Sequence, residues 1–555
     1  MKKGYPTERG PLPPGMKLDE NIYVTMRDGI KIAVDVYRPE TKDRYPAILS
    51  MSPYLKEIQR QPPVLTHGVE AGATDFFVPR GYVYVIAQIR GTGLSQGQWN
   101  FLDTKEQQDG YDLVEWIAQQ SWCDGNVGML GDSYFAMIQF LVAAQQPPHL
   151  KCIVPYDGLT DPYRDFCYRG GIFYNGFLGM WTAAATRQAV WPGHVEGKLP
   201  PCNLLVDLAS HTEDGPYYLE RAASTKLDKI KVPMLSISPQ SSLHIIGQLH
   251  SYPVIKAPKK LLIVPPPGFM TNVQFILNQP LNEQMLRWFD YWLKGINTGI
   301  MDEPPVAIFD SGTDEWRYEN EYPLARTKWT KFYLRTNPAG PSTEPPYGLI
   351  SVEPPGNEEP DSYKTPQCLG LLAAGKPVLA YATPPLDKDV QIWGPLSAIL
   401  HGSSTTMDTA WFVKLGDVGP DGKVKLLAHG HLKASHREVD ESRSKPGQPF
   451  HPFQKPVPPE PHKVYEYQIE IWPIFHTFRK GHKIWVQIAS VDFGYQLSDD
   501  IYATELMPLP AENVVYHDSA HLSHLLLPVI PDAPMIKPVE SPISEIKWPP
   551  EHRVF

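Results

Sequence analysis

Hydrophobic and polar residues alternate, or run together, in patterns that change along the chain. Residues 21–37 alternate on either side of the Asp28-Gly29 pair, which predicts a β-hairpin with its turn at that pair. Residues 109–119 have the spacing of an amphipathic helix. Three short apolar runs are continuous, as in strands buried on both faces of a parallel sheet: Tyr45 to Met51, Tyr82 to Ala87 and Leu150 to Pro155. Strands that alternate with helices in this way predict an α/β domain with a mostly parallel sheet.

The pattern changes twice further along the chain. Between residues 160 and 225, aromatic residues occur at helical spacing and strand signals are few, so we expect a helical cap inserted between two strands of the sheet. Phe166 and Trp181 belong to this segment and are our candidates for lining an apolar substrate pocket, although core packing is the commoner role of such residues. From Pro304 onward, short alternating strands separated by turn residues predict an all-β sandwich.

Composition narrows the classes of function. The chain has 555 residues, too many for one core, and a net charge of −10, which argues against a nucleic-acid-binding surface. Its five cysteines form no Cys-x-x-Cys pair, which predicts buried free thiols, and its histidine clusters lack nearby ligands of suitable spacing, so we expect no metal site. No cofactor is implied either. The N-terminal residues lack the apolar run of a signal peptide, and no window has the length of a membrane span. We expect a cytoplasmic protein that acts on a small molecule, without a membrane or nucleic-acid partner.

A candidate nucleophile follows the apolar run Val127 to Leu130. Gly131 ends this run, Ser133 comes two residues later, and the next residues have helical character. A strand, a tight turn with serine at its apex and a helix form a nucleophile elbow, in which a small residue two before the serine lets the strand and helix backbones approach. The second small position of the usual pattern holds Phe135, with Ala136 one residue further on, so the motif is incomplete. A chance Gly-x-Ser at the end of a strand is the alternative interpretation.

The segments around this serine favour the elbow. Upstream stand Arg90-Gly-Thr-Gly, Asp109-Gly-Tyr-Asp and Trp122-Cys-Asp-Gly. In this order and spacing they resemble the cocaine esterase/X-prolyl dipeptidyl aminopeptidase family of serine hydrolases, which also includes the α-amino-acid ester hydrolases. The family's elbow, Gly-x-Ser-Tyr-x-Gly, is matched by Gly131, Ser133 and Tyr134, with Ala136 in the last place. The resemblance continues into the C-terminal half through Leu293-Lys-Gly-Ile-Asn-Thr-Gly, Asp417-Val-Gly-Pro-Asp-Gly and Phe478-Arg-Lys-Gly-His-Lys.

The resemblance implies a fold and two oxyanion donors. The fold is an α/β-hydrolase domain with a helical cap insertion and a C-terminal all-β jelly-roll domain. The expected boundaries are 1–159 and 226–303 for the two parts of the α/β-hydrolase domain, 160–225 for the cap and 304–555 for the jelly roll. The family's oxyanion hole uses a tyrosine hydroxyl, matched by Tyr54, and the backbone N–H after the nucleophile, here that of Tyr134. Self-association into a homo-oligomer through the sandwich domain is a further expectation.

The remaining parts of a catalytic triad do not match the family. The family's acid corresponds to a position near Ser242, and its histidine corresponds to a position near Phe269. From Leu261 to Asn282 the sequence contains no Asp, Glu, His, Lys or Arg, so shifting the alignment by a few residues finds no base there. We therefore expect the standard triad to be absent.

One hypothesis is that the base has moved. His244 would be the base, with His250 as its nearest competitor, and the acid would come from the loop after the preceding strand, from Asp157, Asp161 or Asp165. The protein would then cleave or transfer the acyl group of a small ester or amide. Esterase activity is favoured over cleavage of X-Pro peptides, because no acidic grip for a free amine is identified beyond these aspartates.

The other hypothesis is that hydrolysis has been lost. A serine without a base is a poor nucleophile. A pocket with oxyanion donors can nevertheless assist a cyclase, isomerase or lyase, and it can also serve a non-catalytic binder. Asp132, beside Ser133, would then act as an acid or base, or remain a solvated turn residue.

Overall fold

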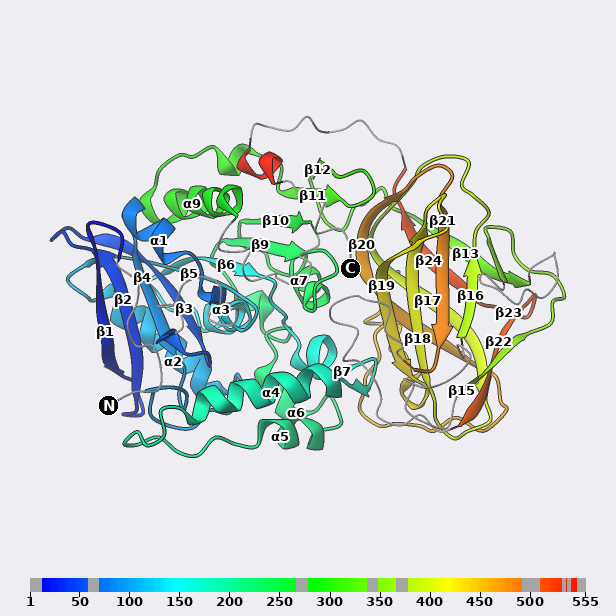
Figure 1. Cartoon of the computed structure of the whole chain (residues 1–555), viewed down its shortest axis with the longest axis horizontal. Helices are drawn as coiled ribbons and strands as arrows, with labels where there is room; N and C mark the ends of the chain where they lie inside the picture. The colour runs from blue at the N-terminus through cyan, green and yellow to red at the C-terminus, as the bar shows by residue number, and fades with distance from the viewer. Residues whose placement is uncertain are drawn as a thin grey trace.

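The computed structural model describes residues 12–57, 69–265, 278–336, 348–365, 378–491, 510–531, 536 and 541–546. Figure 1 shows two parts side by side, an α/β part with the N-terminal strands and an all-β part from the C-terminal half. Three helices lie along one side of the α/β part: α4 (Asn175–Val190), α5 (Leu204–Ser210) and α6 (Pro216–Arg221). They follow a π-turn at Pro162–Cys167 and a short strand pair, β7 (Tyr168–Arg169) and β8 (Ile172–Phe173), so this segment is the helical cap.

The α/β part is built on one ten-stranded sheet. Its strands lie in the spatial order β1 (Met16–Thr25), β2 (Lys31–Pro39), β4 (Val83–Gln88), β3 (Tyr45–Ser52), β5 (Cys123–Asp132), β6 (Leu150–Tyr156), β9 (Met234–Pro239), β10 (Lys259–Val264), β11 (Val306–Asp310) and β12 (Glu315–Glu319). β1 and β2 form the predicted hairpin, and pairing from β4 through β11 is parallel. β11 and β12 extend this sheet beyond residue 304, where we expected the sandwich to begin.

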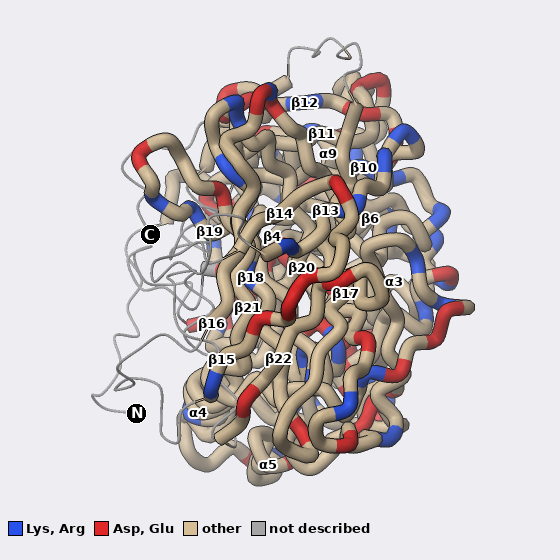
Figure 2. Tube along the Cα trace, turned by 90° about the vertical axis from the view of Figure 1, so that its right-hand side faces the viewer, with Lys and Arg blue, Asp and Glu red and all other residues tan. Residues whose placement is uncertain are grey.

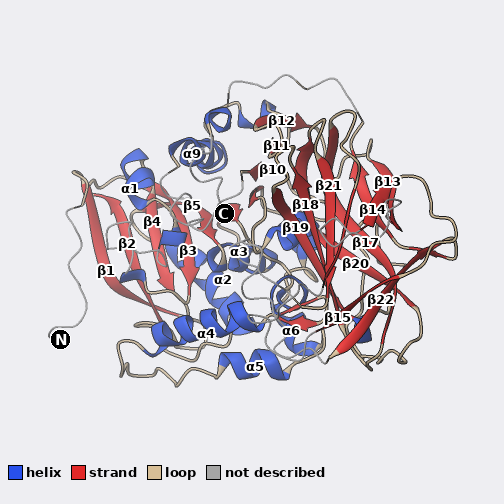
Figure 3. Ribbon diagram, turned by 45° about the vertical axis from the view of Figure 1, so that its right-hand side comes forward, coloured by secondary structure: helices blue, strands red, loops and turns tan. Residues whose placement is uncertain are grey.

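Helices cover both faces of this sheet, as Figure 3 shows in blue. The helices are α1 (Thr74–Phe77), α2 (Thr104–Ala118), α3 (Tyr134–Ala144), α7 (Ile245–Ser251) and α9 (Gln279–Lys294). Every residue of α3 is buried, in keeping with its almost wholly apolar sequence. Because parallel strands present their carboxyl ends at one edge of a sheet, the residues after β5, β6 and β9 lie close together.

The C-terminal part contains only strands and short 3₁₀ turns among its described residues, which confirms the predicted all-β domain. Its twelve strands are β13 (Lys328–Thr336), β14 (Gly348–Ser351), β15 (Asp361–Thr365), β16 (Val378–Ala382), β17 (Val390–Ser404), β18 (Ala410–Val418), β19 (Val424–Lys433), β20 (Tyr465–Phe478), β21 (Lys483–Ala489), β22 (Ala511–Asp518), β23 (His521–Leu522) and β24 (His524–Val529). The sheet closes on itself because β24 pairs with both β13 and β17. Figure 2 shows basic and acidic residues interspersed over the molecule. The jelly-roll connectivity stays a prediction.

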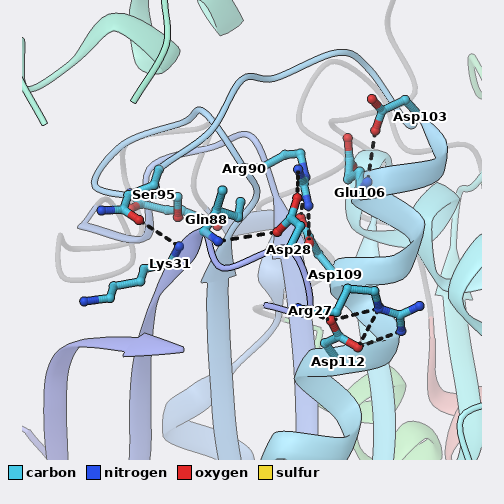
Figure 4. Close-up of polar contacts among 12 residues, drawn as sticks. Arg27, Asp28, Lys31, Gln88, Arg90, Ser95, Asp103, Glu106, Asp109 and Asp112 are labelled. Atoms are coloured by element: carbon cyan, nitrogen blue, oxygen red, sulfur yellow. Dashed lines mark hydrogen bonds and ion pairs between the residues drawn. The ribbon is translucent and has the colours of Figure 1, made fainter. Parts of the chain in front are cut away.

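Arg90 connects the loop between β4 and α2 to helix α2 and to the turn of the N-terminal hairpin. Its Nε donates to Asp109 Oδ2 on α2 over 2.7 Å, and its Nη1 donates to Asp28 Oδ2 in the hairpin turn over 3.0 Å, as Figure 4 shows. Further along the loop, the indole Nε1 of Trp99 donates to the hydroxyl of Tyr134 over 3.2 Å. The loop that begins with the Arg90 segment, one of those that carry the family resemblance, thus contacts the residue that follows the candidate nucleophile.

The structure also bears on the expectations for membrane spans, metal sites and cysteines. Among the described residues, no helix is long and apolar enough to cross a membrane, and no three metal-binding side chains are arranged around one point. Cys123, Cys152 and Cys167 are buried free thiols, and Cys202 is a half-buried one. Cys368 lies outside the described residues.

Candidate active site

Ser133 occupies the turn between β5 and α3. Its backbone has φ 58° and ψ −119°, a conformation that L-residues other than glycine rarely adopt and that is typical of strained functional turns. Gly131 is required here, because its φ is +152° and a Cβ atom would lie 2.3 Å from the Cβ of Phe135. On the other side of the turn, a Cβ atom on Gly158 would lie 2.8 Å from that of Ala136. The small residue that this close approach needs is therefore Ala136, three positions after the serine.

Tyr54 lies in the loop after β3, where its phenol interacts with the side chain of Ser133, an interaction that acts to lower the pKa of the phenol. Its hydroxyl oxygen also accepts a hydrogen bond from the indole Nε1 of Trp181 on α4, over 3.0 Å. Burial raises the pKa of Tyr54 well above its usual value, and the carboxyl groups of Glu70 and Asp132 raise it further. The phenol therefore keeps its proton at neutral pH and can donate it in a hydrogen bond.

Tyr134 is the first residue of α3, so its backbone N–H has no partner within the helix. Its side chain is buried, and its hydroxyl donates to Glu106 Oε1 over 3.0 Å. Burial raises the pKa of Glu106 to about 8. Glu106 was not among the site residues predicted from the sequence. Its place three residues after Asp103 is typical of a capping box, and that spacing explains the start of α2 but not the contact with Tyr134.

Phe166 and Trp181, the predicted substrate-binding residues, lie together beside Tyr54. Their ring centroids are 5.5 Å apart in an edge-to-face arrangement, and Trp181 stacks on Tyr134 with centroids 6.4 Å apart. Phe101, which was not predicted from the sequence, lies beside them. Its ring centroid is 6.3 Å from that of Phe166 and 5.7 Å from that of Trp181. These residues form an aromatic wall next to Tyr54, a composition typical of small-molecule sites.

His244 is buried at the start of α7. Its ring lies 5.8 Å from that of Phe166, and its Nδ1 has no hydrogen-bond partner among the described residues. Burial, and then the nearby guanidinium of Arg169, lower the pKa of His244 to about 3, so the imidazole is neutral at pH 7. Within the described part of the chain, no hydrogen bond joins this imidazole to Ser133 or to Asp157. The role of His244 as the base stays a prediction.

Two other positions bear on the identity of the base, His250 and the family's own histidine position near Phe269. His250 lies on α7, and its Nε2 is 2.8 Å from Oε1 of Glu470 on β20, so this histidine is engaged with the all-β domain. Phe269, near the family's histidine position, lies outside the described residues.

Asp157 contacts the position that corresponds to the family's acid. Its carboxylate accepts a hydrogen bond from the hydroxyl of Ser242, which follows β9. The contact arises because β6 and β9 pair in parallel and end at the same edge of the sheet. The other two candidate aspartates accept hydrogen bonds from backbone N–H groups of their own segment, those of Tyr163 and Arg164 for Asp161, and those of Thr160 and Asp161 for Asp165.

Two further carboxyl groups lie near the candidate nucleophile. Asp132 is buried directly before Ser133, and its Oδ2 has no hydrogen-bond partner among the described residues. Burial raises the pKa of Asp132 well above its usual value, and Glu70 and Asp157 add to this effect. Glu70 is buried in a 3₁₀ turn at Val69–Ala71. A single glutamate in an irregular segment belongs to no recognisable pattern, so Glu70 could not be predicted as a site residue.

Two protein-family models match successive parts of the chain. The first, described as X-Pro dipeptidyl-peptidase (S15 family), matches residues 28–267, and the second, described as X-Pro dipeptidyl-peptidase C-terminal non-catalytic domain, matches residues 298–526. The chain belongs to the cocaine esterase/X-prolyl dipeptidyl aminopeptidase family. Within the family, the cocaine esterase of Rhodococcus sp. (strain MB1 Bresler) is 27% identical over an alignment that covers 92% of this chain and 98% of the relative.

Solved structures of similar proteins share the fold. A CocE/NonD family hydrolase from Staphylococcus aureus has a TM-score of 0.82 and 24% identity, and the match covers 93% of this chain and 94% of that one. An aminopeptidase from the marine sediment archaeon Thaumarchaeota archaeon has a TM-score of 0.72 and 19% identity, with coverage of 96% and 99%. Family membership together with the esterase relative supports a hydrolase.

Proposed function

We propose that this protein is a serine hydrolase that cleaves or transfers the acyl group of a small ester or amide through Ser133. The observation that carries the proposal is the strained strand–helix elbow at Ser133, whose side chain interacts with the phenol of Tyr54. A half-buried serine at a strained elbow is suited to nucleophilic attack, and a protonated tyrosine beside it is suited to stabilising an oxyanion.

The proposed reaction begins with attack of Ser133 Oγ on the substrate carbonyl. The negative charge that develops on the carbonyl oxygen would receive hydrogen bonds from the hydroxyl of Tyr54 and the backbone N–H of Tyr134. Such donors strengthen in the transition state and lower the barrier, because they are held in place before the charge forms. The aromatic wall of Phe166 and Trp181 would hold an apolar acyl group beside the nucleophile. Collapse of the intermediate would release the leaving group, and water or another acceptor would then take the acyl group from Ser133.

His244 is the general base of the proposed reaction. His244 is neutral, which is the form that accepts a proton, but its lowered pKa makes it a weak base in the unliganded protein. Asp157 would serve as the acid at the edge of the sheet where the family carries its own. A non-hydrolytic enzyme, such as a cyclase, isomerase or lyase, is the second candidate function. It is favoured by the raised pKa of Asp132, because a buried carboxyl that holds its proton can act as an acid in such chemistry.

Covalent labelling with a fluorophosphonate, read as intact mass, tests the proposal on wild type, Ser133→Ala and His244→Ala. Ser210→Ala is the matched control, because Ser210 is an exposed serine at the end of α5. We expect one adduct on wild type and on the control, and none on Ser133→Ala. Loss of the adduct in His244→Ala identifies the base, whereas its retention places the base elsewhere. An unlabelled wild type would sink the hydrolase proposal and favour the non-hydrolytic one.

A further inference from the structure

A cavity of about 600 Å³ lies between the cap and the all-β domain. Its wall combines residues of the segment 160–170, helix α7, strands β19 and β20 and the segment 443–454. None of the residues that the proposed reaction uses lines it. A ligand in this cavity would therefore be a second molecule, separate from a substrate at Ser133.

The cap approaches strand β19 closely at Gly170, which follows β7. The backbone oxygen of Gly170 accepts a hydrogen bond from the backbone N–H of Lys433 over 2.8 Å. A Cβ atom at residue 170 would overlap the backbone carbonyl of His431, so only glycine allows this approach. Because Arg169 directly precedes this glycine, Arg169 and His431 lie in neighbouring parts of the cavity wall.

The guanidinium of Arg169 is held in place by its neighbours but is not fully used. The side chain is 5% exposed and lies against two aromatic rings, 4.2 Å from the centroid of Tyr174 and 4.7 Å from that of Trp472. Its Nη2 donates to the backbone oxygen of Leu243 over 2.9 Å, and its Nε donates to the backbone oxygen of Asp165 over 3.4 Å. Its Nη1 has no hydrogen-bond partner among the described residues. Part of the donor fork is thus available to a ligand.

The imidazole of His431 is a second buried group in this wall. The residue is 7% exposed, its ring lies edge-to-face with that of Phe412 at 5.0 Å, and its Nε2 has no hydrogen-bond partner in the described part of the chain. Burial lowers the pKa of His431 well below its usual value, and the neighbouring His429 and Arg169 lower it further. A neutral imidazole carries one N–H, which Nε2 can present to a ligand.

The carboxyl groups that line the cavity do not neutralise Arg169. Asp214 Oδ2 accepts from Arg164 over 2.7 Å, and Glu470 Oε1 lies 2.8 Å from Nε2 of His250. The other two carboxyl groups accept hydrogen bonds from backbone N–H groups of their own segment. Within the described ranges Arg169 forms no ion pair, and a buried cation without a counter-charge is costly. An anion that enters the cavity would offset this cost.

From this arrangement we infer that the cavity binds a small carboxylic acid as its monoanion, with the carboxylate on Arg169 and His431. A guanidinium fork matches a planar carboxylate in geometry. The volume is sufficient for a ligand with an apolar body as well as a carboxylate. The side chains of Trp472, Tyr322 and Phe450 line the cavity and provide apolar surface for that body.

A carboxylate suits the cavity better than a phosphate. Four carboxyl groups belong to the same wall, those of Asp161, Asp165, Asp214 and Glu470, and they repel a dianion more strongly than a monoanion. The inference does not depend on hydrolysis at Ser133, because none of the residues of the proposed reaction takes part in this binding.

Calorimetry on the full-length protein tests the inference. The probes are 3-phenylpropanoate and the neutral 3-phenylpropanamide, which have nearly the same shape. We expect the acid to bind about tenfold or more tightly than the amide, the difference expected for hydrogen bonds to a charged group. Arg169→Met should reduce the affinity for the acid to that for the amide. His431→Phe, which keeps a ring but loses Nε2, should weaken binding of the acid by a smaller factor.

Arg221→Met is the matched control. Arg221 is also a buried arginine stacked on a ring, that of Tyr217 at 3.8 Å, but it does not line the cavity. This variant should keep the full preference for the acid. If Arg169→Met does not fold, Arg169→Lys replaces it, because lysine keeps the charge but loses the fork and should weaken the preference without abolishing it.

Tyr54→Phe separates this cavity from the oxyanion hole at Ser133, the other place where a carboxylate would find donors. We expect this variant to leave the affinity for 3-phenylpropanoate unchanged. Four results would overturn the inference. They are equal binding of the acid and the amide, a preference as large in the Arg169 variant as in the wild type, a preference lost in Tyr54→Phe, and tighter binding of inorganic phosphate than of the acid. None of them depends on whether Ser133 is labelled by a fluorophosphonate, so the two proposals fail separately.

Discussion

The indole Nε1 of Trp181 donates a hydrogen bond to the hydroxyl oxygen of Tyr54 over 3.0 Å. The indole is only a donor, so it occupies a lone pair of the phenol and leaves the phenolic proton for another acceptor. The proton is then available to an oxyanion that forms beside Ser133, whose side chain interacts with the phenol. A residue of the cap helix α4 therefore sets the orientation of a group that we place in the oxyanion hole. We classify Trp181 as a positioning residue as well as part of the aromatic wall.

Tyr54→Phe and Trp181→Phe should lower kcat to different extents. Tyr54→Phe removes an oxyanion donor and should lower kcat by about 10²–10³-fold. Trp181→Phe keeps an aromatic ring but removes the N–H that orients the phenol, so we expect a decrease of about tenfold. Both changes should appear mainly in kcat, because the donor acts in the transition state. Steady-state kinetics on a phenyl ester measures this, with Trp116→Phe, which lies on α2 beside Trp122, as the control. An effect of Trp181→Phe on KM alone would contradict the positioning role.

Gly131→Ala should destabilise the protein and disturb the elbow. The added Cβ would lie 2.3 Å from the Cβ of Phe135, which belongs to the buried helix α3 and has little room to move. Overpacking of this kind costs about 1–3 kcal/mol. Gly179→Ala is the control, because Gly179 lies inside α4 with no atom within 4 Å of the added Cβ, and alanine there should stabilise by about 0.5–1 kcal/mol. Equal free energies of unfolding for the two variants would refute the steric requirement.

The elements that the sequence predicted best are those with a local pattern. The hairpin of β1 and β2, the buried strands and the elbow depend on periodicity and on residues within a few positions of one another. The nucleophile elbow differs from the usual pattern at one position. Phe135 occupies the usual second small position without conflict, because the helix approaches Gly158 at Ala136 instead. The small residue of the elbow therefore stands at position 136 instead of position 135. This shift depends on the packing of α3 and could be recognised only through the family pattern.

The parts of the site that escaped prediction depend on contacts distant in sequence. Glu106 is 28 residues away from Tyr134 in the sequence, yet their side chains are hydrogen-bonded. Because Glu106 also fits a capping box, its presence is explained locally, and nothing in the sequence points to this second contact. The imidazole of His244 lies beside Phe166 and near Arg169, two residues of the segment 160–225, and no sequence pattern predicts that proximity. Asp157 was predictable as a candidate because parallel strands end at one edge of the sheet. The contact between Asp157 and Ser242 was not predictable, because it depends on the register of β9 against β6.

Glu106→Gln should make stability less dependent on pH. Burial raises the pKa of Glu106 to about 8 in the folded protein, whereas an unfolded glutamate has a pKa of about 4.3. Between these values the folded state holds a proton that the unfolded state has lost. The stability contributed by this group is therefore complete below about pH 4.3 and is lost as the pH rises through 8. Its contribution to the free energy of unfolding should fall by up to about 1.4 kcal/mol per pH unit.

Urea denaturation at pH 5, 6.5 and 8 measures this effect as the difference between variant and wild type, in which the other titrating groups cancel. Glutamine can accept from Leu102 N–H and donate to the hydroxyl of Tyr134, so Glu106→Gln should gain on the wild type as the pH rises. Glu196→Gln, a change at an exposed residue of the cap, should show no such trend. A difference that stays constant from pH 5 to pH 8 would show that Glu106 is ionised in the folded protein.

Asp157 and Ser242 should show a large coupling energy in a double-mutant cycle. Their hydrogen bond is buried, involves a charged acceptor and ties the loop after β6 to the loop that leads into α7 and His244. A hydrogen bond of this kind contributes about 1.5–3 kcal/mol, and Asp157→Ala or Ser242→Ala alone should lose most of it. Because each single change already breaks the contact, the double variant should be little worse than either single one. Asp157→Asn is the matched comparison and should lose less stability, since its side-chain oxygen can still accept from the serine hydroxyl. Additive effects of the two alanine substitutions would mean that the aspartate acts through another partner, and the histidine candidates would then be the next to test.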